Sequence, residues 1–533
     1  MFTAGASLHS QSLPKPQFRA VILCGYGSDL YPLVEPTTGQ AENADDSNTD
    51  GGEAARLRAR APGQVKALLP VAGKRMIDWV LESVEEAGVY DILVLSPDSL
   101  SGPLAHHLRA RRASMSAGMS SNPSSAKVEL EEVPEGVARG GTVEIVRWAA
   151  EQDLIKTDFI ILPCDLLMSP NGTNPVISLA SLLDRHRADD NLLTMLFYER
   201  AAGGVVEARK DGPSEILTVF DSKTSTLLDI REMDEFDAEE VPLRTSLLAR
   251  FPSPTLSTSL LPSQIYILSS ALLPLLSSPA HDRRLRHMEN IREFAAWISR
   301  LAWRNGGRDA VGYRDPRMTK REDGIALGRS TTLLPVGAAS GGRSPAESMP
   351  QTGANTPAIN GHGRFATNPW EEAESQNTAR ARVPGGGCKV VVWRSKDGWC
   401  GRGNTVAGWV EMNRAALKLL PPAVAATNTP PGVFISPDSF LHPSVYGNLG
   451  EKVGLKRCII GKGSIVGKNS KLTNVVVMEN AVIGENTKLE NCVLSNGAQV
   501  RDRAILKDCE LGRDVIVDAE TQLKGEQLVV EEE

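Results

Sequence analysis

The sequence lacks several features that would indicate an extracellular, metal-binding or membrane protein. It holds seven cysteines, an odd number, and no two of them form a CxxC pair. We therefore expect neither a disulfide framework nor a zinc site. No run of about 18 apolar residues occurs, as a transmembrane helix would require, and residues 1–17 lack the apolar centre of a signal peptide. The predicted location is the cytosol, without membrane contact.

A concentrated positive charge is also missing. The chain carries 58 basic and 65 acidic residues, a net charge of −7. The one basic cluster, Arg109, Arg111 and Arg112, lies in a serine-rich stretch that we interpret as a solvated loop. Direct nucleic-acid binding needs a clustered basic face, so we predict no nucleic-acid partner.

The first three hundred residues alternate between strand and helix patterns. Residues 18–24, 89–95 and 158–162 are short apolar runs, typical of strands buried on both faces, and helical patterns cover residues 76–87 and 142–152. This alternation predicts an α/β domain with a mostly parallel sheet. Later strand patterns lack regular helices between them, so we expect the second half of the sheet to be mixed.

Three segments have compositions that cannot bury enough apolar surface to fold. Residues 39–63 are acidic and glycine-rich, residues 113–126 are rich in serine, and residues 324–387 form a long low-complexity stretch. We therefore place an α/β domain at 18–323 with disordered insertions at 39–63 and 113–126. A disordered segment at 324–387 and a connecting segment at 388–431 follow. The apolar stripe of the helix at 290–303 indicates internal core or a surface for domain packing.

A repeat of 17 residues covers positions 432–525. Three apolar columns follow this period, spaced 6, 6 and 5 residues apart, and polar residues stack at Asn474, Asn491 and Asp508. Three short faces per coil predict a triangular prism whose coils must stack to be stable. Cys458, Cys492 and Cys509 share a column with Val475, so we interpret them as buried apolar side chains. The columns are, in order, Leu455, Leu472, Leu489, Leu506; Ile460, Val477, Leu494, Leu511; and Val466, Ile483, Val500, Val517.

The repeat units resemble the hexapeptide repeats of left-handed β-helices, and the left hand is what that resemblance implies. Such prisms serve as acyltransferases, regulatory domains or docking platforms. No histidine follows His442, which argues against an acyltransferase that would need one near a coil.

A glycine-rich turn follows the first strand. Residues 23–33 read LCGYGSDLYPL, and residues 66–77 read KALLPVAGKRMI. Such a turn lets backbone N–H groups approach a phosphate. Together the two segments resemble the signature of sugar-1-phosphate nucleotidylyltransferases, which have a Rossmann-like, glycosyltransferase-A-like fold and use magnesium. The resemblance assigns nucleotide contacts to Gly25, Gly27, Lys66 and Gly141, and a magnesium ligand to Asp165.

The reacting charges depart from that family's pattern. Asp29 stands where the family has an arginine that stabilises the leaving pyrophosphate, and Cys24 stands where it usually has glycine. A carboxylate beside a triphosphate is repulsive. We therefore expect a degenerate pocket with no catalytic residue and no cofactor, with magnesium only if the pocket were still active.

A retained scaffold with altered charges resembles the gamma-subunit family of the guanine-nucleotide exchange factor for translation initiation factor two. The segments RGNT at 402–405 and WVEMNR at 409–414 also resemble that family's connecting region. The resemblance implies a non-catalytic subunit that works with the epsilon subunit, other exchange-factor subunits and initiation factor two. Epsilon relatives carry a further helical domain, so we expect the gamma type here. Two alternatives remain: an active nucleotidylyltransferase, for example one that forms GDP-mannose, and a regulatory subunit that binds a nucleotide sugar.

Overall fold

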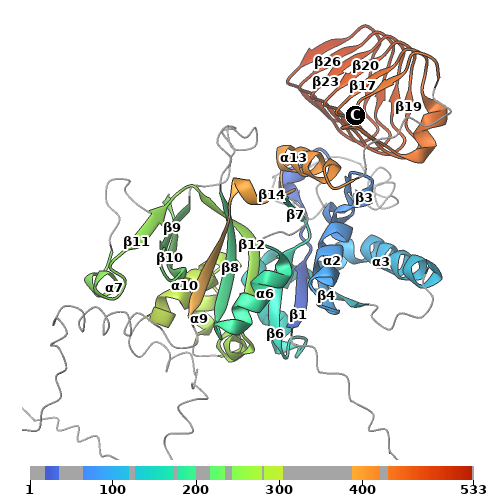
Figure 1. Ribbon diagram of the computed structural model, residues 1–533. Coiled ribbons are helices and arrows are strands. Elements are labelled where there is room, and N and C mark those ends of the chain that lie inside the picture. Colours follow the sequence, from blue (N-terminus) through green and yellow to red (C-terminus); the bar gives the residue numbers. More distant parts are fainter. Residues whose placement is uncertain are drawn as a thin grey trace, which may run out of the picture.

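The computed structural model describes residues 18–34, 64–118, 126–171, 177–199, 216–233, 243–278, 281–303, 387–420 and 430–530. These residues form an α/β domain and a prism of short parallel strands beside it (Figure 1). The insertion predicted at 39–63 and the segment at 324–386 lie outside the described residues.

The α/β domain is built on one ten-stranded sheet. Its centre is parallel, because β1 pairs in parallel with both β4 and β6. Strand β12 runs antiparallel to β6 and β8, which confirms the mixed second half. The strands, in spatial order, are β11 (Pro254–Ser257), β9 (Ile216–Asp221), β10 (Thr226–Glu232), β13 (Cys388–Trp393), β8 (Leu193–Glu199), β12 (Leu260–Leu268), β6 (Asp158–Pro163), β1 (Phe18–Leu23), β4 (Asp91–Pro97) and β5 (Lys127–Val133).

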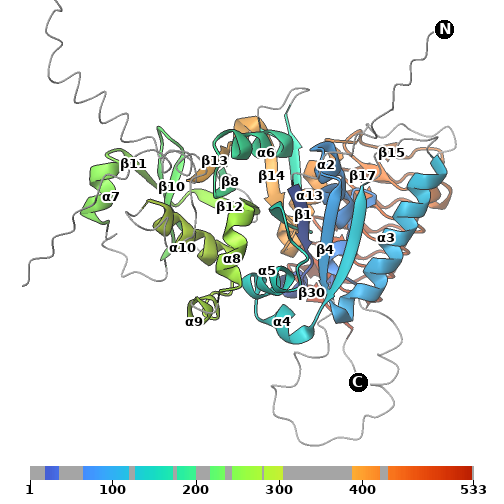
Figure 2. The same ribbon diagram turned by 90° about the horizontal axis from the view of Figure 1, so that it is seen from below.

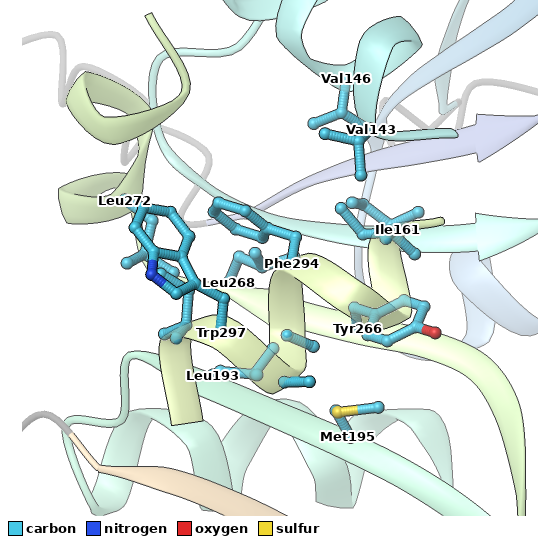
Figure 3. Close-up of a cluster of buried hydrophobic side chains, with 14 of the residues drawn as sticks. Val143, Val146, Ile161, Leu193, Met195, Tyr266, Leu268, Leu272, Phe294 and Trp297 are labelled. Carbon is cyan, nitrogen blue, oxygen red and sulfur yellow. The ribbon is translucent and has the colours of Figure 1, made fainter. Parts of the chain in front are cut away.

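Helices cover both faces of this sheet (Figure 2). On one face, α5 (Thr142–Glu151) and α10 (Ile291–Trp303) pack with the strands into a buried cluster that contains Tyr266, Phe294 and Trp297 (Figure 3). The apolar stripe of α10 is therefore internal core. The other face carries α2 (Met76–Glu86) and α6 (Leu179–Ala188). Shorter helices are α4 (Glu135–Arg139), α7 (Thr245–Arg250), α8 (Leu273–Leu276) and α9 (Asp282–Leu285).

Two predicted boundaries were wrong. Residues 113–118 continue α3 (Asp98–Gly118) rather than forming part of a loop insertion. Arg111 explains why, because its guanidinium lies 3.0 Å from Glu85 and 3.5 Å from Asp78 of α2 and anchors the helix. The basic cluster therefore lies on a helix. In addition, β13, assigned to a connecting segment, lies inside the main sheet and pairs in parallel with β8, because its apolar run is buried there.

The C-terminal prism has three flat sheets of stacked strands. Register partners in successive coils are 17 residues apart, for example Leu455, Leu472 and Leu489, as the repeat predicted. The structure and the hexapeptide pattern fit a left-handed β-helix. The β15–β29 sheet holds β15 (Phe434–Ile435), β17 (Gly454–Lys456), β20 (Lys471–Thr473), β23 (Lys488–Glu490), β26 (Ile505–Lys507) and β29 (Gln522–Lys524). The β16–β30 sheet holds β16 (Phe440–Leu441), β18 (Ile459–Ile460), β21 (Val476–Val477), β24 (Val493–Leu494), β27 (Glu510–Leu511) and β30 (Gln527–Leu528). The β19–β28 sheet holds β19 (Ile465–Val466), β22 (Val482–Ile483), β25 (Gln499–Val500) and β28 (Ile516–Val517).

The corners of the prism explain the stacked polar residues. Asn474, Asn491 and Asp508 all have positive φ angles, between 54° and 59°, a conformation that asparagine and aspartate tolerate better than most residues. Each Asn side chain donates a hydrogen bond to the next residue in the stack. The three cysteines of the repeat are buried and free, as predicted.

One face of the prism packs against the α/β domain. Helix α13 (Val406–Leu417) and the hairpin of β2 (Pro70–Val71) and β3 (Lys74–Arg75) form an apolar cluster with the outer side chains of the β16–β30 sheet, Ile459, Val476 and Val493. Arg75 also lies 2.8 Å from Glu479 of the prism. The two parts therefore share a continuous apolar interface.

Candidate functional site

The candidate site lies where the first strand of the sheet ends. The chain leaves β1 and makes a tight turn at Gly27, whose φ is +80°. A short 3-10 helix, Ser28–Leu30, follows. A Cβ added to Gly27 would lie 3.0 Å from the Cβ of Lys66, so this turn packs against the side chain of Lys66. The structure thus brings together two of the predicted nucleotide contacts.

Lys66 and Asp165 form a buried ion pair. The Nζ of Lys66 lies 2.6 Å from Oδ2 of Asp165, and the Asp165 side chain is fully buried. Asp165 follows β6, and Lys66 begins the 3-10 helix Lys66–Leu68. Both residues were predicted for the site, one as a phosphate contact and one as a magnesium ligand, but in the structure they neutralise each other.

A second cation, which the sequence analysis did not place in the site, completes the cluster. Arg402, the last residue of β14 (Gly398–Arg402), donates from Nε to Oδ1 of Asp165 and from Nη2 to Oδ2, each at 3.0 Å. This two-pronged contact is the geometry in which arginine binds a carboxylate most specifically. The backbone adds to it, because the N–H of Gly403 donates to the carbonyl of Asp165 at 2.8 Å.

The electrostatics of the cluster favour the ionised carboxylate. Burial alone would raise the pKa of Asp165, but the charges and hydrogen bonds of Arg402 and Lys66 outweigh it and hold that pKa well below its ordinary value. Burial likewise opposes the charge on Arg402, yet the carboxylate of Asp165 raises the pKa of the guanidinium. The three groups therefore carry two positive charges and one negative charge.

The cysteine that replaces a family glycine is accommodated away from the turn. Cys24 and Cys164 are both buried, and their backbone N–H groups extend the strand pairing to Leu95 and Leu23. The neighbouring side chain of Cys164 and burial raise the pKa of Cys24. The pKa of Cys164 is lowered by the side chain of Cys24 and by the positive charge of Lys66. Cys24 therefore serves as packing beneath the loop.

The remaining predicted residues lie outside the Lys66–Asp165–Arg402 cluster. Gly25 is exposed, and a Cβ added there would meet nothing within 4 Å. Gly141 is the N-cap residue of α5 and lies against the backbone of Glu289, in the loop before α10. Asp29 is exposed, and its side chain accepts a hydrogen bond from the hydroxyl of Ser28 at 3.4 Å.

A tyrosine of the same loop has a partner of its own. The hydroxyl of Tyr26 donates to the carboxylate of Glu135 in α4. Burial and this carboxylate raise the pKa of Tyr26 to about 12. The contact joins the loop to α4 and leaves the tyrosine a neutral donor.

The donor set at Asp165 does not fit a magnesium ion. Magnesium is held by carboxylate oxygens and water in near-octahedral geometry, and both oxygens of Asp165 are taken by cationic side chains. Across the described ranges, no group of three or more His, Cys, Asp or Glu side chains is placed to hold a metal ion.

Two segments of the chain match known protein families, and a longer part of it is similar to one known protein. Residues 50–219 match the nucleotidyl transferase family, and residues 446–529 match the GlmU-like C-terminal hexapeptide family. The chain thus joins a nucleotidyl transferase domain to a hexapeptide β-helix. It is similar to the translation initiation factor eIF2B subunit gamma of Schizosaccharomyces pombe, with 23% identity over 345 residues.

That alignment covers 61% of this chain and 65% of the relative, so the chain spans somewhat less than two thirds of the relative's length. Together with the two domain families, the match confirms the resemblance to the gamma-subunit family. Within the part of the chain that the structure describes, no helix has the length and apolarity needed to cross a bilayer.

Proposed function

We propose that this chain is a non-catalytic subunit of the guanine-nucleotide exchange factor that acts on translation initiation factor two. In this role it binds the epsilon subunit and other exchange-factor subunits in the cytosol and promotes the exchange of GDP for GTP on the initiation factor. The similarity to the gamma subunit supports the assembly role, and the geometry of the Lys66–Asp165–Arg402 cluster supports the absence of catalysis.

The observation that carries the proposal is that the carboxylate of Asp165 is paired with two cationic side chains. A nucleotidylyltransferase needs a free carboxylate for its metal ion and free cations for the triphosphate. Here Arg402 and Lys66 are both committed to that carboxylate at 2.6–3.0 Å. The loop carries an exposed carboxylate, Asp29, and supplies no arginine of its own. Arg402 adds a cation to the site, but its guanidinium is directed at the carboxylate of Asp165.

The absence of catalysis is tested by pyrophosphate release. The purified chain is incubated with each nucleoside triphosphate, sugar-1-phosphates and magnesium, next to a Lys66→Ala variant as background. We expect equal release from both proteins. Release by the wild-type chain that the Lys66→Ala variant lacks would show an active nucleotidylyltransferase and overturn the proposal.

The assembly role is tested on a surface that the structure leaves uncovered. On the β19–β28 sheet, Ile465, Val482 and Ile516 point outward and are 45%, 36% and 53% exposed. Register pairing aligns Ile465 with Val482 in neighbouring coils, so they form one apolar column. Such a column suits burial against another subunit.

The experiment is affinity purification of the tagged full-length chain from its own cells, with mass spectrometry of the co-purifying chains. We expect exchange-factor subunits and initiation factor two with the wild-type chain, and their loss with the double variant Ile465→Asp, Val482→Asp. Leu256→Asp in β11, where that residue is 42% exposed and away from the prism, is the matched control. Purification of the wild-type chain alone, with a thermal shift by nucleotide sugars, would instead indicate a stand-alone sensor.

A further inference from the structure

The three faces of the prism differ sharply in the side chains that they turn outward. The β16–β30 sheet turns Ile459, Val476 and Val493 outward, and the α/β domain covers these three residues. The outward side chains of the β19–β28 sheet form an uncharged column that includes Ile465 and Val482. The β15–β29 sheet is different, since five of its outward positions are lysines, all of them exposed: Lys456, Lys471, Lys488, Lys507 and Lys524. Figure 1 shows this sheet on the side of the prism turned away from the α/β domain.

The lysines are concentrated on this face although the domain is not basic. Residues 432–530 contain twelve basic and twelve acidic side chains. One acidic residue, Glu490, shares the outward positions of the sheet, and it lies 2.9 Å from Lys488 and 3.9 Å from Lys507. Over the described residues, Lys456, Lys471 and Lys524 form no ion pair. The face therefore keeps a net positive charge.

Two pairs of these lysines stand directly opposite each other. Lys471 is the register partner of Lys488, and Lys507 is the register partner of Lys524. Neighbouring strands lie about 4.8 Å apart, and like charges in facing positions destabilise a sheet. Folding alone would favour neutral or alternating residues at these positions. A negatively charged ligand that bridges the facing lysines removes the repulsion.

We propose that the lysine face of the β15–β29 sheet is a docking site for an extended, acidic segment of another protein. A carboxylate-rich peptide fits this face better than nucleic acid does. The lysines lie on a flat sheet with one strongly exposed aromatic residue, Phe434, and a platform for stacked bases needs several. The domain also has no net positive charge to attract a nucleic-acid backbone. This site is separate from the apolar column and does not depend on the proposed exchange-factor role.

The test is fluorescence anisotropy with the full-length chain at about 50 mM salt, where charge pairs at a surface are weakly screened. The probe is a fluorescein-labelled peptide of twelve glutamates, and an oligouridylate of twelve nucleotides serves as the comparison. We expect the wild-type chain to bind the peptide more tightly than the RNA. The variant Lys471→Ser, Lys488→Ser should bind the peptide about fivefold more weakly, from two exposed charge contacts.

The matched control removes two basic residues elsewhere on the prism, Lys462→Ser and Arg501→Ser. Both are exposed and lie outside the β15–β29 sheet, and this variant should bind within twofold of the wild-type chain. An equal loss in the control would show diffuse attraction to the whole surface and overturn the proposal. Tighter binding of the RNA, or no peptide binding by the wild-type chain, would overturn it as well.

Discussion

Replacement of Arg402 by methionine tests the buried charge cluster most directly. Methionine keeps much of the aliphatic length of the side chain and removes the guanidinium, so the main loss is the two hydrogen bonds of 3.0 Å to Asp165. Breaking a buried ion pair from one side typically costs about 3–5 kcal/mol. Lys66 stays 2.6 Å from the same carboxylate and keeps a counter-charge in place. We therefore expect the lower end of this range, about 3 kcal/mol.

The assay is thermal unfolding followed by tryptophan fluorescence, because Trp393 and Trp409 are buried on either side of Arg402 in the sequence. For a domain of this size, 1 kcal/mol corresponds to about 2–4 °C in Tm, so the expected fall is about 6–12 °C. The matched control is Arg394→Met, since Arg394 is 61% exposed and lies 3.8 Å from Glu199. Exposed pairs of this kind contribute less than about 1 kcal/mol. Equal midpoints for the two variants would refute the assignment of Arg402 as the counter-ion of Asp165.

The pH dependence gives a second reading of the same variant. In the wild-type fold the pKa of Asp165 lies below its unfolded value, so its stabilising contribution is complete above the unfolded pKa of about 3.9. That contribution is lost only as pH falls through the folded pKa. We expect the difference between the wild-type chain and Arg402→Met to stay constant from about pH 5 to pH 8. A difference that changes across this window would contradict the proposed electrostatics.

Three further predictions concern the core, the domain contact and a buried histidine. Leu489→Ala opens a cavity at the centre of the prism and should cost about 2–5 kcal/mol in urea unfolding, whereas Ile465→Ala, at a position 45% exposed, should cost less than about 1 kcal/mol. Gly73→Ala should expose α13 to hydrogen exchange, because its Cβ would lie 2.3 Å from an aromatic ring of β16; Gly88→Ala, with a similar φ and open space around it, should not. Burial lowers the pKa of His186 to about 4. The stability that the neutral imidazole contributes is therefore complete above about pH 6.5 and is lost as pH falls from there to about pH 4. His186→Gln should reduce the dependence of the unfolding free energy on pH in this range.

The repeat could be predicted because its information is local. Every large inward residue of a coil recurs 17 positions later, so Leu455, Leu472 and Leu489 predict the stacking without long-range knowledge. The strands around β1 were predictable for a related reason, since residues buried on both faces form continuous apolar runs. The end of α3 was not, because its serines and glycine resemble a loop until the contacts of Arg111 with α2 are known.

The site was harder to predict because its residues are remote in the sequence. The motif placed Lys66 and Asp165 near each other, and the structure agrees. It did not indicate Arg402, which lies 237 positions after Asp165. The composition of the intervening residues 324–387 suggested a domain boundary there, which hid that β13 and β14 return to the α/β domain. A basic residue at the end of a short strand and directly before a glycine is too common a pattern to identify a counter-ion.

The Lys66–Asp165–Arg402 cluster and the contact between the two domains involve the same segment. Strand β14 pairs with β7 (Leu166–Pro170) along five register positions, and this pairing carries Arg402 to Asp165. Helix α13 follows directly and contacts the prism through Arg414, whose Nε donates to Oδ1 of Asn474 at 3.0 Å. In the same helix, Asn413 accepts a hydrogen bond from the N–H of Ala72 at 2.9 Å. A movement of the Arg402 backbone away from Asp165 would therefore disturb the pairing of β14 with β7 and the packing of α13. The guanidinium that pairs with Asp165 is therefore held in place by the same segment that contacts the β-helix.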